Sequence, residues 1–241
     1  MTPSITQDAV NAALSSFLSA ILPAGVTIVV GQVNRVASPE GDYCVMWPLR
    51  RPRLSTNVDT PVDSKFTGSI SAGVLTVSAV DPVLNGPIGI GSVIFGVNVA
   101  DGTTVVAPAG TGTGGVGTYN VSPPQTVASG TLSAGVIEVE QSTEVVMQVD
   151  VHGPASADNV QTISTLFRDG YAVDQMAAAG VTPLYADDPR QAPFTTAAAQ
   201  FEDRWMVDLH MQIDPTVAVP QEFFDATALT VTDVDVAFPP Q

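Results

Sequence analysis

The sequence predicts an α+β fold: a mostly antiparallel sheet with helices on one face, plus an inserted small all-β domain. Two segments, residues 144–152 and 204–214, alternate between apolar and polar side chains, as strands do when one face of a sheet is buried. Two other segments repeat apolar residues at helical spacing, and a third, shorter helix is expected before Gly180. Between residues 65 and 133 the chain consists of short β-like runs separated by Gly and Pro, without helical periodicity.

The N-terminal segment is predicted to be an amphipathic helix. Thr6 is a suitable N-cap, because its hydroxyl can accept a hydrogen bond from a free N–H of the first turn. Pro23 and Gly25 end the helix. Strands are expected to follow at residues 26–33 and 43–49. The residues that form the apolar stripe of the helix are Val10, Ala13, Leu14, Phe17, Leu18 and Ile21.

The second half of the chain predicts a strand, two helices and two further strands. The strand over residues 144–152 is followed by a helix that begins near Ser156 and a shorter helix over residues 171–179. After a loop, a strand is expected at residues 204–214 and a last β-like stretch at 228–238. Because the alternating strands have one apolar face, we expect the helices to cover that face. The opposite, polar face must meet water or another subunit.

The expected domain boundaries lie where the helical and alternating patterns give way to short β-like runs separated by Gly and Pro. Residues 1–64 and 134–241 are predicted to form one discontinuous α+β domain, and residues 65–133 an inserted β module. The strand candidates within the module are residues 66–70, 74–80, 92–99 and 119–121.

The charge of the chain argues against a protein that grips nucleic acid. There are 24 acidic and 8 basic residues, which gives a net charge of −16. The acids are concentrated in residues 136–241, which hold 17 acids and 3 bases, whereas residues 1–53 hold 3 acids and 4 bases. A protein that binds DNA through its phosphates needs the opposite sign. An acidic surface suits DNA that passes without sticking.

The residues that could carry chemistry do not form a catalytic constellation, so we expect neither an enzyme nor a cofactor or metal site. His152 and His210 lie on the polar faces of predicted strands, and neither accompanies the G-x-S-x-G motif of many serine hydrolases. The adjacent Asp187 and Asp188 indicate a turn more than a pair of glycosidase carboxylates. The glycine-rich run 112–118 lacks the Lys-Ser/Thr of a phosphate-binding loop and leads into a strand.

The cysteine content and the N-terminus exclude further classes. Cys44 is the single cysteine and lies in an apolar run, so we expect a buried, inert thiol without a disulfide. Residues 1–4 lack the features of a signal peptide, and no segment approaches the ~20 apolar residues of a membrane span. We therefore expect a protein made in a cytoplasm, without a membrane partner.

Several phrases in residues 144–221 resemble the phage neck or tail terminator proteins of contractile-tailed phages. Residues 46–50 look like the earlier strand of that family, with Trp47 where the family often has Thr. Phe201 stands where the family usually has Tyr, which removes a hydroxyl. The β module is similar, through residues 66–70 and 114–122, to a small module that recurs in phage virion proteins. The matching phrases of the main domain are residues 149–154, 166–169, 183–190 and 201–205.

This resemblance implies a structural virion protein, located in the neck or tail, that forms a hexameric ring on the tail tube. Such a ring stops tube growth and joins the tail to the head-completion proteins. The expected partners are further copies of the chain, the tail tube and sheath proteins, the head-completion proteins, and DNA in transient passage. Two alternatives stay open: a head-completion or stopper protein, and a glycan- or receptor-binding virion module. The second would need exposed aromatic side chains in the insert, where the candidates are Phe66, Phe95 and Tyr119.

Two sets of residues are candidates for functional surfaces. The polar faces of the two alternating strands are expected to line the lumen of the ring, because an acidic wall does not hold DNA. Four arginines in loops are candidates for contacts between subunits, because they lie beside an acidic second half of the chain. The lumen candidates are Asp150, His152, Asp208, His210 and Asp214, and the interface candidates are Arg50, Arg51, Arg53 and Arg190.

Overall fold

The structure is a computed structural model that describes residues 2–31, 39, 41–110, 112–192, 194–195 and 201–220. The chain divides into two compact units. The first unit contains residues 1–60 and 138–218, and the second contains residues 61–137 and, among the other described residues, 219–220. Each unit has a hydrophobic core of its own.

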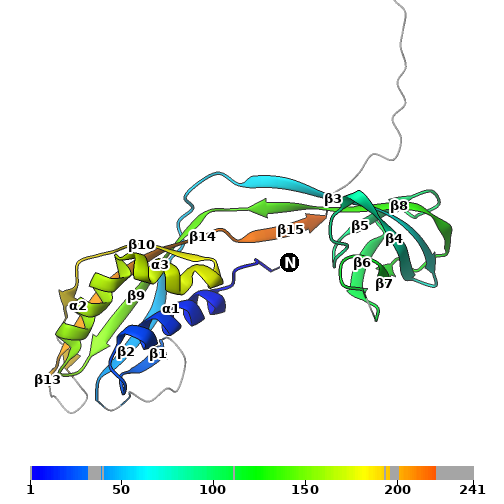
Figure 1. The fold of residues 1–241 in the computed structure, drawn as a ribbon. Coiled ribbons are helices and arrows are strands. Elements are labelled where there is room, and N and C mark those ends of the chain that lie inside the picture. Colours follow the sequence, from blue (N-terminus) through cyan, green and yellow to red (C-terminus); the bar gives the residue numbers. More distant parts are fainter. Residues whose placement is uncertain are drawn as a thin grey trace, which may run out of the picture. The chain divides into compact units, whose positions relative to one another are not determined.

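The first unit is built on a mixed sheet (Figure 1). Its strand order is β1-β2-β9-β14-β10, and the short β11 also pairs with β14. Strands β1 and β2 are parallel, whereas β9 pairs with β2 and β14, and β14 with β10 and β11, in antiparallel fashion. The strands are β1 (Thr27–Val30), β2 (Tyr43–Arg50), β9 (Thr143–His152), β10 (Val181–Ala186), β11 (Arg190–Gln191) and β14 (Arg204–Ile213).

The helices of the first unit bury their apolar stripes in the same core as the strands. Helix α1 (Gln7–Ile21) begins after Thr6, whose hydroxyl accepts a hydrogen bond from the Ala9 N–H, which confirms the predicted N-cap. Helix α2 (Ser156–Phe167) meets α1 through an edge-to-face contact between Phe17 and Phe167. Helix α3 (Gly170–Met176) continues into a 3₁₀ turn, Ala177–Ala179, which ends at Gly180 with φ +66°. That left-handed conformation favours glycine at the C-terminus of a helix.

Two of the strands predicted for the first unit are confirmed over their whole length or nearly so, and one is shorter than predicted. The strands predicted at 144–152 and 204–214 are confirmed as β9 and β14. The strand predicted at 26–33 is shorter as β1, and residues 32–33 lie outside the described part of the chain. The β-like stretch predicted at 228–238 also lies outside it.

The second unit is a closed β-barrel. Its strands follow the order β8-β3-β4-β7-β6-β5, and β5 pairs again with β8 through residues 93–96 and 132–135, which closes the barrel. A seventh strand, β15 (Thr216–Pro220), pairs with β8. The barrel strands are β3 (Val58–Ser71), β4 (Val74–Asn85), β5 (Val93–Gly96), β6 (Thr104–Pro108), β7 (Gly117–Ser122) and β8 (Val127–Glu140).

The predicted α+β class is wrong. About half of the chain is strand and less than a fifth is helix, so the chain is mostly β. The sheet of the first unit is mixed, and the β-rich region is a six-stranded closed barrel. Strands β3 and β8 are 14 residues long, although Gly and Ser residues interrupt their apolar pattern. Cross-strand hydrogen bonds hold such strands together, and a periodicity analysis of one segment does not detect those bonds.

Candidate functional site

The polar face of the first unit's sheet collects most of the charged side chains that the sequence singles out. Successive residues of a strand point to opposite faces, so the even-numbered residues of β9 and β14 share this face. The antiparallel register places Met206 opposite Asp150, Asp208 opposite Gln148, and Gln212 opposite Glu144. The pairing thus brings polar side chains that are about 60 residues apart in sequence onto neighbouring strands.

One cluster on this face is centred on Asp150, which is only 1% exposed. Its carboxylate accepts hydrogen bonds from the guanidinium of Arg204, including Nε at 2.6 Å, and from the Gln148 amide at 2.7 Å. A buried carboxylate requires such compensation, because removing a charge from water is costly. Asp150 therefore has a structural role, and the guanidinium of Arg204 on β14 compensates its charge.

His152 lies at the end of the same strand. Its imidazole stacks on the ring of Tyr43, with centroids 4.4 Å apart, and its Nδ1 is 3.0 Å from a carboxylate oxygen of Glu202. Burial lowers the pKa of His152 below its ordinary value of 6.5, and the neighbouring Glu202 opposes that shift.

A second cluster surrounds His210, which is 2% exposed. Its Nδ1 is 2.5 Å from a carboxylate oxygen of Glu144, and the ring of Tyr185 stacks on its imidazole. Its Nε2 makes no hydrogen bond within the described part of the chain and lies 3.6 Å from a carboxylate oxygen of Asp187. Partial desolvation, together with the charges of Glu144 and Asp187, raises the pKa of Tyr185.

The lumen candidates therefore differ in accessibility. Asp150, His152 and His210 are buried within the single chain, where each contacts other side chains. Asp208 is half-buried and pairs with Arg190 at 3.3 Å. Asp214 is exposed and accepts a hydrogen bond from the Ser142 hydroxyl at 2.6 Å.

The interface candidates also separate into two groups. Arg190 has an acidic partner, Asp208, in its own chain. Arg50, Arg51 and Arg53 are exposed, and none of the three forms an ion pair with a residue that the structure describes. Arg51 donates a hydrogen bond to the side-chain oxygen of Gln7 at 2.7 Å.

The adjacent carboxylates and the single cysteine do not form a catalytic arrangement with one another. Asp187 faces His210, whereas Asp188 pairs with Arg168, so the two adjacent carboxylates have different partners. Cys44 is buried, and burial raises the pKa of its thiol to about 12. Among the described residues, no group of three or more His, Cys, Asp and Glu side chains is arranged to hold a metal ion.

The glycine-rich run 112–118 is tied to the barrel by one tyrosine. The hydroxyl of Tyr119 accepts a hydrogen bond from the Gly114 N–H at 3.0 Å and donates one to the Gly115 carbonyl at 2.7 Å. The run leads into β7, so its backbone N–H groups do not converge at a helix N-terminus as they do in a phosphate-binding loop.

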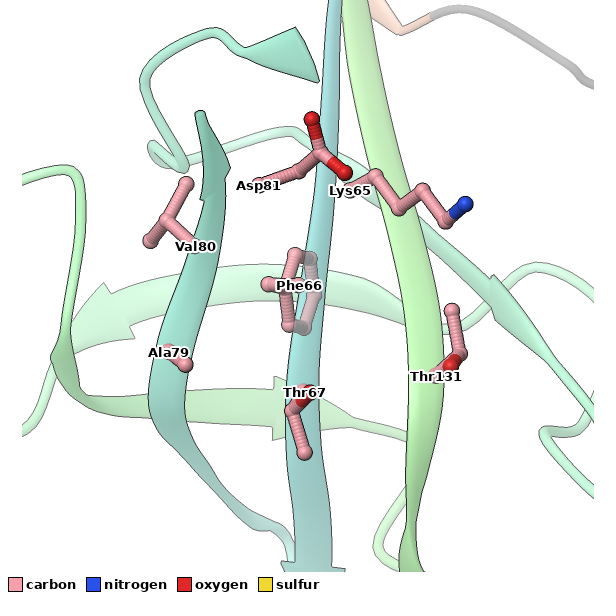
Figure 2. A pocket seen from close by; sticks show the side chains of 7 residues that line it. All are labelled: Lys65, Phe66, Thr67, Ala79, Val80, Asp81 and Thr131. Atoms are coloured by element: carbon pink, nitrogen blue, oxygen red, sulfur yellow. The ribbon is translucent and has the colours of Figure 1, made fainter. Parts of the chain in front are cut away.

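The barrel has two shallow hollows on its surface. Figure 2 shows the first, of about 240 Å³, with Lys65, Asp81 and Thr131 among its lining residues. The carboxylate of Asp81 accepts hydrogen bonds from the N–H groups of Val83 and Leu84, and these bonds lower its pKa. The second hollow, of about 290 Å³, lies beside Tyr119.

The aromatic residues proposed for glycan or receptor binding mostly serve the barrel core. Phe66 is 2% exposed and Tyr119 is 1% exposed, so neither offers a ring face to a ligand, and Phe95 is half-buried. Stacking on a sugar requires an accessible aromatic face, which the buried rings of Phe66 and Tyr119 do not supply.

Some partners in the clusters were not identified from the sequence. Glu144 and Arg204 lie on the same alternating faces as the histidines and could have been found by that signal. Tyr43, Tyr185 and Glu202 lie on other segments, so only strand pairing and the fold of the connecting chain reveal them.

Comparison with protein families supports a viral structural role. A family model described as phage neck terminator protein matches residues 77–235. The match begins in β4, covers β5 to β8 but not β3, and continues through β9, α2, α3 and β14. No protein among the curated sequences is significantly similar to the chain. None of the helices described here is long and apolar enough to span a membrane.

Proposed function

Because the chain belongs to the phage neck terminator protein family, and is thus a structural protein of the virion, we propose that it forms a ring at the head–tail joint. The ring ends the tail tube and lets DNA pass. The observation that carries this proposal is the family match over residues 77–235. We further propose six copies, with the tail tube, the sheath and the head-completion proteins as neighbours.

The charge of the chain supports passage of DNA without retention. In this proposal the sheet's polar face contributes to the wall of the channel, with the exposed carboxylate of Asp214 and the half-buried carboxylate of Asp208, which pairs with Arg190. Asp150, His152 and His210 lie beneath that surface and hold the strands together. An acidic wall does not release counterions from DNA, so it gives the DNA no reason to stay. At physiological salt the repulsion extends only about 8 Å, so the wall acts as a lining and not as a barrier.

The length of the tails on particles made without this chain tests the proposal. A tail terminator is expected to leave tubes longer than normal when it is removed, because nothing stops the addition of tube subunits. Electron micrographs of such particles measure tail length directly. Tails of normal length beside heads that lose their DNA would instead indicate a head-completion or stopper protein.

The channel wall can be tested separately. Replacing both Asp208 and Asp214 by lysine is expected to slow DNA ejection while particles still assemble, because lysines at these positions bind phosphate. The matched control replaces both residues by asparagine, which removes the acid without adding a base. Ejection at the normal rate from the lysine particles would contradict a lumenal position for this face.

A further inference from the structure

The first unit has one exposed basic segment that also carries apolar side chains. We name Leu49, Arg50, Arg51, Arg53 and Leu54 the arginine segment; it comprises the last two residues of β2 and the chain directly after it. Leu49 is 46% exposed and Leu54 is 47% exposed. In a chain of net charge −16, three bases within four residues form an unusual local charge.

A hollow of about 330 Å³ adjoins this segment. Its lining combines Arg51, the apolar Pro3, Val139, Pro215 and Val217, and the polar Asn57, Gln141 and Thr143, so it offers some apolar wall beside a cation. Arginine next to apolar surface is typical of the centre of protein–protein interfaces, whereas surfaces that bind nucleic acid are basic and polar. The arginine segment therefore fits a protein partner better than DNA.

A complementary surface lies on the helices of the same unit. Asp158 of α2 and Asp174 of α3 are exposed and form no ion pair with any described residue. Tyr171 and Val173 of α3 are 39% and 41% exposed, so they add partly exposed apolar surface beside these acids. We name these four exposed residues of the two helices, which are not confined to one side of α3, the α2–α3 face.

We propose that the arginine segment of one copy binds the α2–α3 face of a second copy. A basic segment repels its own copy, so the contact joins two different surfaces, and such head-to-tail contacts generate rings when they close. Each copy then uses both surfaces once. The inference rests on the ring proposed above and names the surfaces through which the ring forms. Exposed ion pairs alone contribute little, so the apolar side chains on both surfaces are part of the proposal.

Charge reversal at each surface, followed by mixing, tests the pairing. One variant is R50E/R53E and the other is D158K/D174K; Asp169 is left unchanged because its carboxylate caps α3. Each variant is produced in cells that make the phage's tails, and the amount of the chain on purified tails is measured by immunoblot. Each variant alone is expected to lose at least about tenfold in incorporation, because like charges meet at every junction. Producing the two together is expected to restore incorporation, because alternating copies place Glu against Lys at every second junction and the native Arg against Asp at the others.

The control variant K65E/D101K reverses one base and one acid at exposed positions of the second unit and is expected to be incorporated normally. Thermal unfolding followed by circular dichroism checks that each variant is folded before it is scored. Normal incorporation of either reversed variant overturns the inference. So does a mixture that stays unincorporated, because the arginine segment would then bind another virion protein or DNA.

A cysteine pair separates this inference from the proposed function. The variant R53C/D174C is expected to give a ladder of disulfide-linked multimers on mild oxidation of purified tails, whereas R53C alone is expected to give none. If the cysteine variant gives a ladder, but particles that lack the chain have tails of normal length, the interface is supported and tube termination is contradicted. Overlong tails without a ladder keep tube termination but contradict this interface.

Discussion

The ring of Tyr185 lies nearly parallel to the imidazole of His210, with centroids 4.0 Å apart and an angle of 15° between the planes. The two residues are directly paired between β10 and β14. Tyr185 is 47% exposed and His210 is 2% exposed, so the tyrosine shields the histidine from water. The polar face of this sheet is thus layered, with exposed side chains covering a buried network.

Removal of the Tyr185 ring is expected to expose His210. The variant Y185A should raise the rate at which diethyl pyrocarbonate modifies His210, because the stacked ring no longer covers the imidazole. The variant Y185F should stay close to the wild type, since it keeps the ring and loses only a long contact of 3.4 Å to Glu144. Equal modification rates in all three proteins would show that other groups shield the histidine.

Loss of Arg204 is expected to destabilise the first unit by about 3 kcal/mol, because it leaves the Asp150 carboxylate buried without a counter-ion. The lower part of the range for buried pairs applies, since the Arg204 side chain is 24% exposed. The double variant D150A/R204A should cost less than the sum of the two single variants. Urea denaturation of the four proteins measures the coupling, and additive effects would mean that the pair is not an energetic unit.

Acidification is expected to destabilise the protein through His152. Its pKa is lowered in the folded state, chiefly by burial, so the unfolded chain takes up a proton first as the pH falls through about 6.5. The stability contribution is present above that pH and declines below it. Melting temperatures measured between pH 8 and pH 5 should fall less steeply in H152Q than in the wild type. Parallel curves for the two proteins would assign the pH dependence to other groups.

Cys44 is expected to be unreactive in the native protein. Its thiol is buried, and a pKa of about 12 leaves almost no thiolate at neutral pH. Iodoacetamide should label the native protein slowly and the urea-unfolded protein quickly. The variant S55C, at an exposed position, provides the reactive control. Rapid labelling of Cys44 in the native state would reveal local opening of β2.

Replacement of residues 65–133 by a short Gly-Ser linker is expected to leave the first unit folded. The chain enters this region on β3 and leaves it on β8, and these strands are hydrogen-bonded neighbours, so the two ends are close enough for a short linker. Circular dichroism and thermal unfolding of the shortened chain test this expectation. An insoluble product would show that the region belongs to the core of the larger domain.

Local features of the sequence determined several elements of this protein. The helical spacing from Val10 to Ile21 and the Thr6 cap define α1, because a helix is stabilised by contacts within one turn and along one face. The alternation in β9 and β14 likewise follows from the two faces of a strand. The phrases around residues 149–154 and 183–190 indicated the phage neck terminator family, which the family match confirms.

Tertiary structure alone decided the fold class and the partners of the charged residues. The barrel closes where Val93 and Gly96 of β5 meet β8, and those hydrogen bonds join segments that are far apart in the sequence. The contact of His210 with Glu144 spans 66 positions and depends on the register of β9 and β14. Local periodicity shows which face of a strand is polar, but the neighbours on that face depend on how the whole chain pairs its strands.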